Sequence, residues 1–329
     1  MKSFFTTYPL LIVIALFAFA LRLYKINTPL LDWHSWRQAD TASVTREFAT
    51  GSLNPLYPTY HDLSSIPSGL DNPEGYRMVE FPLYNVLTAS ILKLAPAFSV
   101  VITSRVVSAL FSIGTLISLF FLAKSYFGKK VGYLAAFFFA VLPYSVFYSR
   151  TTLPEPTMLF FSTLSITCFS YYVKKPKFVT YIISLLALSI AILIKPFVLF
   201  LAPVYAVIVL EKRGFKQTVL DFKLYLYAVL AVIPLWFWRD WITQFPEGIP
   251  ASDWLFNGNG IRFRPAWVRW LGYERITKLI LGYIGIVLLP LSFFQQLFAK
   301  KFLIPAWWLG IAAYFTVIAT GNVQHDYYQ

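Results

Sequence analysis

The chain has 329 residues, of which 58% are hydrophobic and 13% are charged, and its formal net charge is +13 at pH 7. The apolar residues fall in long runs, a pattern typical of proteins whose main solvent is lipid. No basic stripe interleaved with aromatic residues is present, so we expect no nucleic-acid partner. The single cysteine, Cys168, excludes an intrachain disulfide framework and a thiolate metal site.

Nine apolar runs are candidates for membrane spans, each of which needs about 20 apolar residues. They are residues 9–23, 102–123, 131–148, 157–173, 178–194, 197–210, 222–238, 279–298 and 302–319. The run 81–94 is shorter and interrupted by Asn85 and Lys93, which favours a helix at the membrane surface. The sequence therefore predicts an all-α, polytopic membrane protein with about nine transmembrane helices and extracytoplasmic juxtamembrane helices.

The distribution of Lys and Arg predicts the orientation of these spans. With the N-terminus in the cytoplasm, the inner segments hold thirteen of the 28 basic residues but only two of the 15 acids. The two long loops, about 24–101 and 239–278, then lie outside the plasma (inner) membrane. We expect residues 1–329 to form a single integral-membrane domain, truncated at its C-terminus because the chain stops inside a polar, aromatic patch at 325–329.

The densest polar cluster follows the first run and spans residues 32–48. It predicts an interfacial helix in which Asp32 is the N-cap and Gly51 ends the helix. A carboxylate at a membrane boundary can act as a general base toward an acceptor hydroxyl, and Asp40 is the first candidate. The alternative is that Asp40 and Arg37 form a solvated pair on the helix face. His34 has an equally simple alternative role as an interfacial hydrogen-bonding residue.

A second candidate acid, Glu155, lies in an outer segment between two apolar runs. Thr152 and Glu155 fit a capping box with Pro154 in the first turn, and this structural role would suffice to explain the acid. The functional alternative is that Glu155 faces Asp40, where it would orient an acceptor or help to bind a divalent cation.

Lys195 is a lone charge between two apolar runs and precedes Pro196. An ionisable group at this depth usually has a partner or a function. It either extends to the surface or contacts a lipid phosphate. The outer basic residues are mostly Arg, whose planar group bonds phosphate in a bidentate manner, and Arg37 and Arg150 are candidates for such contacts.

The chain has no Walker-type or Gly-rich phosphate loop, and an enzyme acting outside the cytoplasm has no supply of nucleotide sugars. We therefore expect the donor to arrive through the membrane as a polyprenyl-phosphate sugar. The sequence predicts no definite cofactor, and it does not decide whether the enzyme needs a divalent cation.

The order of these features resembles the membrane glycosyltransferases of the C-type fold. In particular it resembles protein O-mannosyltransferases, the lipid A aminoarabinose transferase and bacterial galacturonic acid transferases of lipopolysaccharide. The resemblance rests on the first-loop acid Asp40, the entry Glu80-Phe81-Pro82 to a surface helix, the outer acid Glu155, Lys195 at a helix break, and the patch at 325–329.

The resemblance implies a hexosyl or pentosyl glycosyltransferase in the cell envelope, with a catalytic first-loop acid and a Lys on the donor phosphate. The acceptor would be a lipid, a polysaccharide or a protein. Relatives often carry adjacent Asp and Glu where this chain has Arg37-Gln38, so both Asp40 and Asp32 stay candidates for the base. Residues assigned to acceptor or sugar binding are Asp32, His34, Trp36, His325, Tyr327 and Tyr328.

Two other functions compete with this interpretation. A secondary transporter or lipid flippase would place charges near the bilayer midplane on broken helices and often shows an inverted repeat, and neither is evident in the sequence. A structural subunit without catalysis is the third hypothesis, and an acid-lined cavity beside Asp40 would count against it.

Overall fold

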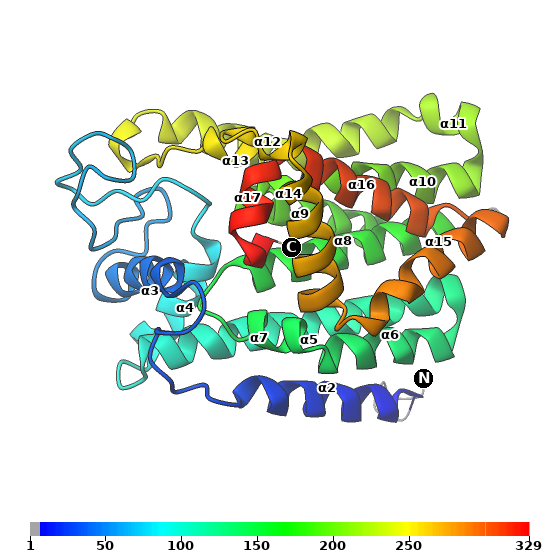
Figure 1. Cartoon of the computed structure of the whole chain (residues 1–329), viewed down its shortest axis with the longest axis horizontal. Coiled ribbons are helices and arrows are strands. Elements are labelled where there is room, and N and C mark those ends of the chain that lie inside the picture. Colours follow the sequence, from blue (N-terminus) through cyan, green and yellow to red (C-terminus); the bar gives the residue numbers. More distant parts are fainter. Residues whose placement is uncertain (1–6, 300, 329) are drawn as a thin grey trace. The chain divides into compact units, whose positions relative to one another are not determined.

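The computed structural model describes residues 7–299 and 301–328, so the predictions that involve Lys2, Lys300 and Gln329 lie outside the described residues. In this part of the chain the protein is helical, and its one β feature is an antiparallel bridge between Thr59 and Tyr76 (Figure 1). The residues form two compact units. Unit 1 comprises 1–164, 187–195 and 232–251, and unit 2 comprises 165–186, 196–231 and 252–329.

Unit 1 contains the N-terminal helices and the long loop between residues 51 and 82. Its complete helices are α2 (Pro9–Leu23), α3 (Ser35–Thr50), α4 (Leu83–Leu94), α5 (Val100–Phe127), α6 (Lys129–Val141), α7 (Pro143–Tyr148) and η2 (Pro246–Gly248). Helix α2 packs on both α5 and α6, as Figure 1 shows along one edge of this unit, and the shared core includes Leu11, Leu116 and Ala136. Helix α3 packs on α4 through Val44, Phe48 and Ala89.

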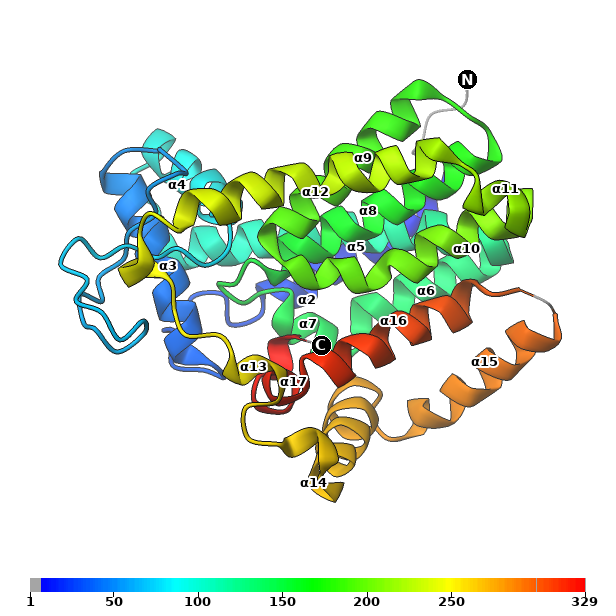
Figure 2. The ribbon, with the colours of Figure 1, turned by 90° about the horizontal axis from the view of Figure 1, so that it is seen from above.

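The remaining helices complete the described chain. They are α8 (Glu155–Lys174), α9 (Phe178–Ile194), η1 (Pro196–Leu201), α10 (Ala202–Arg213), α11 (Phe215–Val219), α12 (Phe222–Ile242), α13 (Trp254–Asn257), η3 (Ile261–Phe263), α14 (Pro265–Val268), η4 (Arg269–Ile280), η5 (Ile284–Val287), α15 (Leu288–Phe298), α16 (Leu303–Val317), α17 (Ala319–Gln324) and η6 (Asp326–Tyr328). Within unit 2, α16 packs between α10 and α15, as seen in Figure 2.

The prediction of about nine transmembrane helices is not confirmed. Among the described residues, α5 and α12 are long and apolar enough to cross a membrane, and a third span results if the sharply bent pair Pro265–Ile280 and Ile284–Phe298 counts as one. Helices occupy the predicted runs, but breaks shorten them. Pro143 separates α6 from α7 within the run 131–148, and the run 197–210 is divided into η1 and α10.

The break at Pro143 shows how unit 1 compensates for a lost helical bond. Pro143 has no N–H to donate to the carbonyl of Phe139, and that oxygen accepts bonds from Ser145 Oγ at 2.7 Å and Arg22 Nη2 at 3.2 Å. Arg22 Nη1 also donates to the carbonyl of Ala140 at 3.2 Å. A fully buried arginine therefore replaces the missing donors, and the break can persist inside the packed unit.

The start of α3 differs from the prediction. The N-cap is His34, in the left-handed region with φ 57, whereas Asp32 was expected there. The C-cap is Gly51 as predicted. The buried face of α3 is largely polar and includes Arg37, Gln38 and Thr41, while Trp36 is exposed.

The predicted capping box at the start of α8 is also wrong. Helix α8 begins at Glu155, so Pro154 precedes the helix and Glu155 occupies the first position. The buried hydroxyl of Thr152 lacks a hydrogen-bond partner in the described part of the chain, and the carboxylate of Glu155 accepts no capping hydrogen bond there. Capping therefore does not explain Glu155.

Candidate active site

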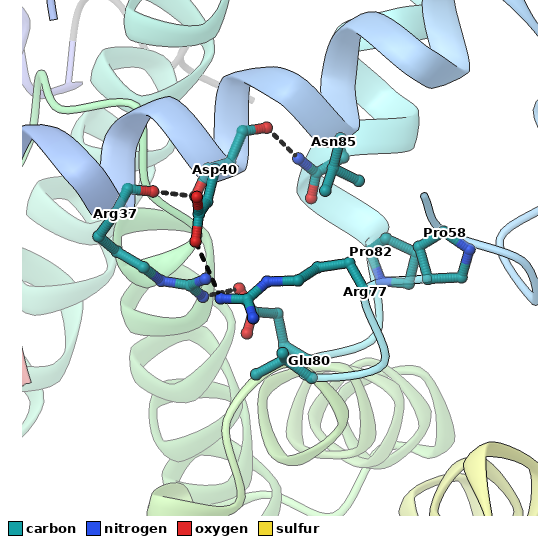
Figure 3. Close-up of a pocket in the computed structure, with 10 residues that line it drawn as sticks. Arg37, Asp40, Pro58, Arg77, Glu80, Pro82 and Asn85 are labelled. Atoms are coloured by element: carbon teal, nitrogen blue, oxygen red, sulfur yellow. Dashed lines mark hydrogen bonds and ion pairs between the residues drawn. The ribbon is translucent and has the colours of Figure 1, made fainter. Parts of the chain in front are cut away.

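A group of charged side chains in unit 1 begins with Asp40 on α3. Its carboxylate accepts a hydrogen bond from Arg77 at 3.1 Å, and one turn earlier Arg37 pairs with Glu80. Figure 3 shows both guanidinium groups directed toward the same space between α3 and the loop that leads to α4. The cavity there measures about 20 Å³, which suits about one water molecule. Asp40 therefore pairs with Arg77, and Arg37 pairs with Glu80, in place of the predicted pair of Asp40 with Arg37.

The loop 51–82 holds Arg77 in place. The Arg77 N–H donates to the carbonyl of Pro58 at 2.8 Å, beside the bridge of Thr59 and Tyr76, and the Tyr60 N–H donates to the carbonyl of Gly75 at 2.8 Å. Gly75 has φ +64, and a Cβ at this position would lie 2.5 Å from the carbonyl oxygen of Tyr60, so the close approach of the two strands requires glycine.

Lys195 extends the charged group through the end of α9. Its ammonium lies 3.2 Å from Glu155 Oε1 and 3.9 Å from Glu80 Oε2. Lys195 is only 7% exposed, so its side chain does not extend to the surface. The two acids therefore share one buried cation, and Asp40, Arg77, Arg37, Glu80, Lys195 and Glu155 form a cluster that we call the charge network.

The environment pushes the pKa values of two carboxyls in this network apart. Burial raises the pKa of Asp40, and the Arg77 and Arg37 guanidiniums oppose that rise without cancelling it. Burial also disfavours the charged form of Glu80, but Arg37 and Lys195 outweigh it and lower the pKa of Glu80 to about 2. Glu80 is therefore a fixed anion, while Asp40 is the carboxylate suited to gaining a proton.

Other predicted residues near α3 have structural contacts. Asp32 accepts a hydrogen bond from Gln38 Nε2 at 2.6 Å and lies 3.6 Å from Arg105. The Trp33 and His34 rings lie 5.9 Å apart. Arg150, predicted to bind phosphate, instead donates to the carbonyls of Tyr24 at 3.0 Å and Lys25 at 3.4 Å.

The predicted patch near the C-terminus lies in unit 2. His325, Tyr327 and Tyr328 stack on one another with ring centroids 4.7–5.4 Å apart. The intervening Asp326 is buried and lies 3.3 Å from Arg275. The patch is therefore an ordered aromatic and ionic cluster within its own unit.

The described residues contain no group of three or more His, Cys, Asp or Glu side chains placed to hold a metal ion. Glu155 and Glu80 meet at Lys195, so a fixed ammonium occupies the position between them that a bridging cation would need.

Two members of the charge network, Arg77 and Glu80, were not predicted as site residues. Both lie in the loop 51–82 just before α4, and Glu80 was noted only as part of the entry to that helix. The sequence signal that could have identified them is an arginine and a glutamate three positions apart, directly before an apolar helix.

An apolar cavity of about 420 Å³ adjoins the charge network in unit 1. It is lined by Leu56, Phe81, Leu193, Pro234, Phe237, Trp238, Asp240 and Trp241. Phe81 directly follows Glu80, and Leu193 lies two residues before Lys195. The Phe81 N–H donates to the carbonyl of Leu193 at 3.4 Å, so the backbones that carry the charges also form the cavity wall.

The chain is similar in sequence to one family of known proteins. Residues 80–238 match the model of the family described as dolichyl-phosphate-mannose-protein mannosyltransferase. No curated protein and no solved structure matches the chain. The matched segment begins at Glu80 and includes Glu155 and Lys195, and it confirms the family resemblance indicated by the sequence.

Proposed function

Because residues 80–238 match the dolichyl-phosphate-mannose-protein mannosyltransferase family, we propose that the protein is a membrane glycosyltransferase that transfers a sugar from a polyprenyl-phosphate donor. The acceptor would carry a hydroxyl group and belong to a lipid, a polysaccharide or a protein. The reaction would take place on the extracytoplasmic side, in agreement with the inner segments, which hold thirteen of the 28 basic residues but only two of the 15 acids.

The observation that carries this proposal is the charge network itself. It brings together a carboxylate with a raised pKa, Asp40, and a buried cation, Lys195, from segments far apart in the sequence. Glu80 links the two parts of the network, because it pairs with Arg37 on α3 and also lies 3.9 Å from Lys195. Burying so many charges is expensive, so such clusters commonly mark functional sites.

The transfer needs a base and an anion-binding group. Asp40 would accept the proton of the acceptor hydroxyl while the acceptor oxygen bonds to the anomeric carbon of the donor sugar. The bond from that carbon to the phosphate oxygen breaks, and the polyprenyl phosphate leaves with the electron pair. Lys195 would stabilise the charge that develops on the phosphate, and Glu155 would orient the acceptor.

The apolar cavity beside the network supports a lipid-linked donor. Phe81, Leu193 and Trp238 give it the apolar wall that an isoprenoid chain requires, while Glu80 and Lys195 lie next to that wall in the sequence. A water-soluble nucleotide sugar would gain little from such a wall. This arrangement therefore favours a donor that has both a lipid chain and a phosphate.

The test is an in vitro transfer assay with the full chain in lipid nanodiscs. Polyprenyl-phosphate donors that carry labelled hexose, pentose or uronic acid are offered with a membrane extract as the acceptor source. Transfer of label from at least one donor supports the proposal. If no donor is consumed, but labelled polyprenyl phosphate crosses the bilayer of protein-containing vesicles, the protein is a flippase and the proposal is wrong.

A further inference from the structure

Gln38 is a fully buried residue on α3 whose amide joins three parts of unit 1. Its Nε2 donates to Asp32 Oδ1 at 2.6 Å and to the carbonyl of Trp33 at 3.1 Å. Its Oε1 accepts a hydrogen bond from the backbone N–H of Thr152 at 3.1 Å. One side chain thus connects α3, the segment before α3, and the segment that leads into α8.

Other bonds attach the segment before α8 to parts of unit 1 outside α3. Arg150 Nη1 donates to the carbonyl of Tyr24 at 3.0 Å. Ser108 Oγ on α5 donates to the carbonyl of Thr151 at 2.7 Å. Thr151 and Thr152 are both buried, and Glu155 follows them at the first position of α8. Among the described residues, the bond from the Thr152 N–H to Gln38 is the hydrogen bond between this segment and α3, the helix that carries Asp40.

The other end of this connection is also anchored. Asp32 lies 3.6 Å from Arg105, and Arg105 Nη1 donates to the carbonyls of Ile26 at 3.0 Å and Thr28 at 2.5 Å. Arg105 is fully buried on α5. The chain of contacts from Arg105 through Asp32 and Gln38 to Thr152 therefore begins and ends at well-packed positions.

We propose that Gln38 is a positioning residue that fixes Glu155 relative to Asp40. Gln38 and Asp40 lie two residues apart on one rigid helix, so a bond that holds Thr152 to Gln38 also holds the start of α8 in register with Asp40. This inference rests on the proposed transfer reaction, in which Glu155 orients the acceptor that Asp40 deprotonates.

Only glutamine meets all of these requirements at position 38. The amide donates to an acid and a carbonyl and accepts from an N–H at the same time. Methionine has a similar volume but none of these bonds, whereas glutamate keeps the acceptor oxygen for Thr152 and places a second acidic oxygen toward Asp32 in place of the N–H. Comparison of the two substitutions therefore distinguishes the effect of losing the bond to Thr152 from the effect of losing the bond to Asp32.

The experiment compares Gln38→Met and Gln38→Glu with wild type in nanodiscs. The matched control is Thr45→Val, which removes another fully buried hydrogen-bonding group of α3 that contacts Asn85 and not Thr152. Amide exchange at Thr152 is followed by fragmentation mass spectrometry, and kcat and half-saturating donor and acceptor concentrations are measured in the transfer assay.

We expect Gln38→Met to speed exchange at Thr152 at least tenfold and to lower kcat by about 10²-fold, because a displacement near 1 Å has such an effect on catalysis. The half-saturating acceptor concentration should rise, while that of the donor changes less than threefold. Gln38→Glu should keep Thr152 protected and recover part of the activity, and Thr45→Val should leave both readouts near wild type.

Unchanged exchange at Thr152 in Gln38→Met overturns the inference, as does faster exchange with unchanged kcat. The exchange measurement needs no donor, so it tests the connection even if the transfer reaction fails. Loss of transfer in wild type, or normal transfer by Asp40→Asn, would refute the proposed function instead, while the exchange result would still decide whether Gln38 holds the start of α8.

Discussion

The ammonium of Lys195 lies 3.2 Å from Oε1 of Glu155, and both side chains are about nine-tenths buried. A buried pair of this kind contributes little net stability, because desolvation of both ions offsets their attraction. We infer that the pair is present because Lys195 also binds a second anion when the substrate enters. In the proposed reaction that anion is the donor phosphate.

Lys195→Met should raise the half-saturating donor concentration at least tenfold, since a hydrogen bond to a charged group contributes about 1.5–3 kcal/mol. Because this change leaves Glu155 without its cation, the variant is also made together with Glu155→Gln to preserve the fold. Lys93→Met is the control, because Lys93 is exposed and donates to the carbonyl of Gly51. A normal donor titration with normal turnover would remove Lys195 from the phosphate site.

Arg77→Met should shift the acid limb of the pH profile of kcat/KM to higher pH. Burial raises the pKa of Asp40, and Arg77 is the strongest influence that opposes this rise, so its loss raises the pKa further. The base is then deprotonated only at higher pH. Arg46→Met, which changes an exposed arginine of α3, should leave the profile in place. A shift to lower pH, or none, would disprove the assignment of this limb to Asp40.

Asp32→Asn should lower the melting temperature and leave transfer largely intact. The asparagine oxygen can still accept from Gln38, but the charge that faces buried Arg105 is lost, at an expected cost of about 1–3 kcal/mol. Melting and transfer are measured on the same nanodisc preparation. An inactive, well-folded Asp32→Asn protein would favour Asp32 over Asp40 as the base.

Glu80 should make folding sensitive to acid. Its pKa falls from the usual 4.5 to about 2 in the folded protein, so the stabilisation is fully present above pH 4.5 and is lost as the pH falls toward 2. Thermal melting in this range should show a steeper loss for wild type than for Glu80→Gln. Parallel curves for the two proteins would show that Glu80 does not carry this dependence.

Composition and hydrophobic runs predicted the helical class and the positions of most helices, because apolar periodicity is a local property of the sequence. The nine predicted spans are not confirmed, since Pro143 breaks a helix whose length cannot be judged from hydropathy alone. Asp32 was misplaced as a cap because its partners, Gln38 and Arg105, follow from tertiary packing.

The site was predictable only in part. Lone charges beside apolar runs identified Lys195 and Glu155, but their pairing depends on how α8 and α9 pack. Arg77 and Glu80 were missed, because the loop 51–82 reaches Asp40 through the bridge of Thr59 with Tyr76 and the turn at Gly75, a non-local arrangement.

The most direct test of the account is sugar transfer by Asp40→Asn in the full chain, with Asp62→Asn as the control. Asp62 lies exposed in the loop 51–82 and accepts a hydrogen bond from the nearby Ser64 N–H at 2.9 Å. We predict that Asp40→Asn remains folded and inserted but loses at least about 10²-fold in transfer from the polyprenyl-phosphate donor, as expected for loss of a general base, while Asp62→Asn keeps the wild-type rate. A folded Asp40→Asn protein that transfers sugar at the wild-type rate would contradict the account.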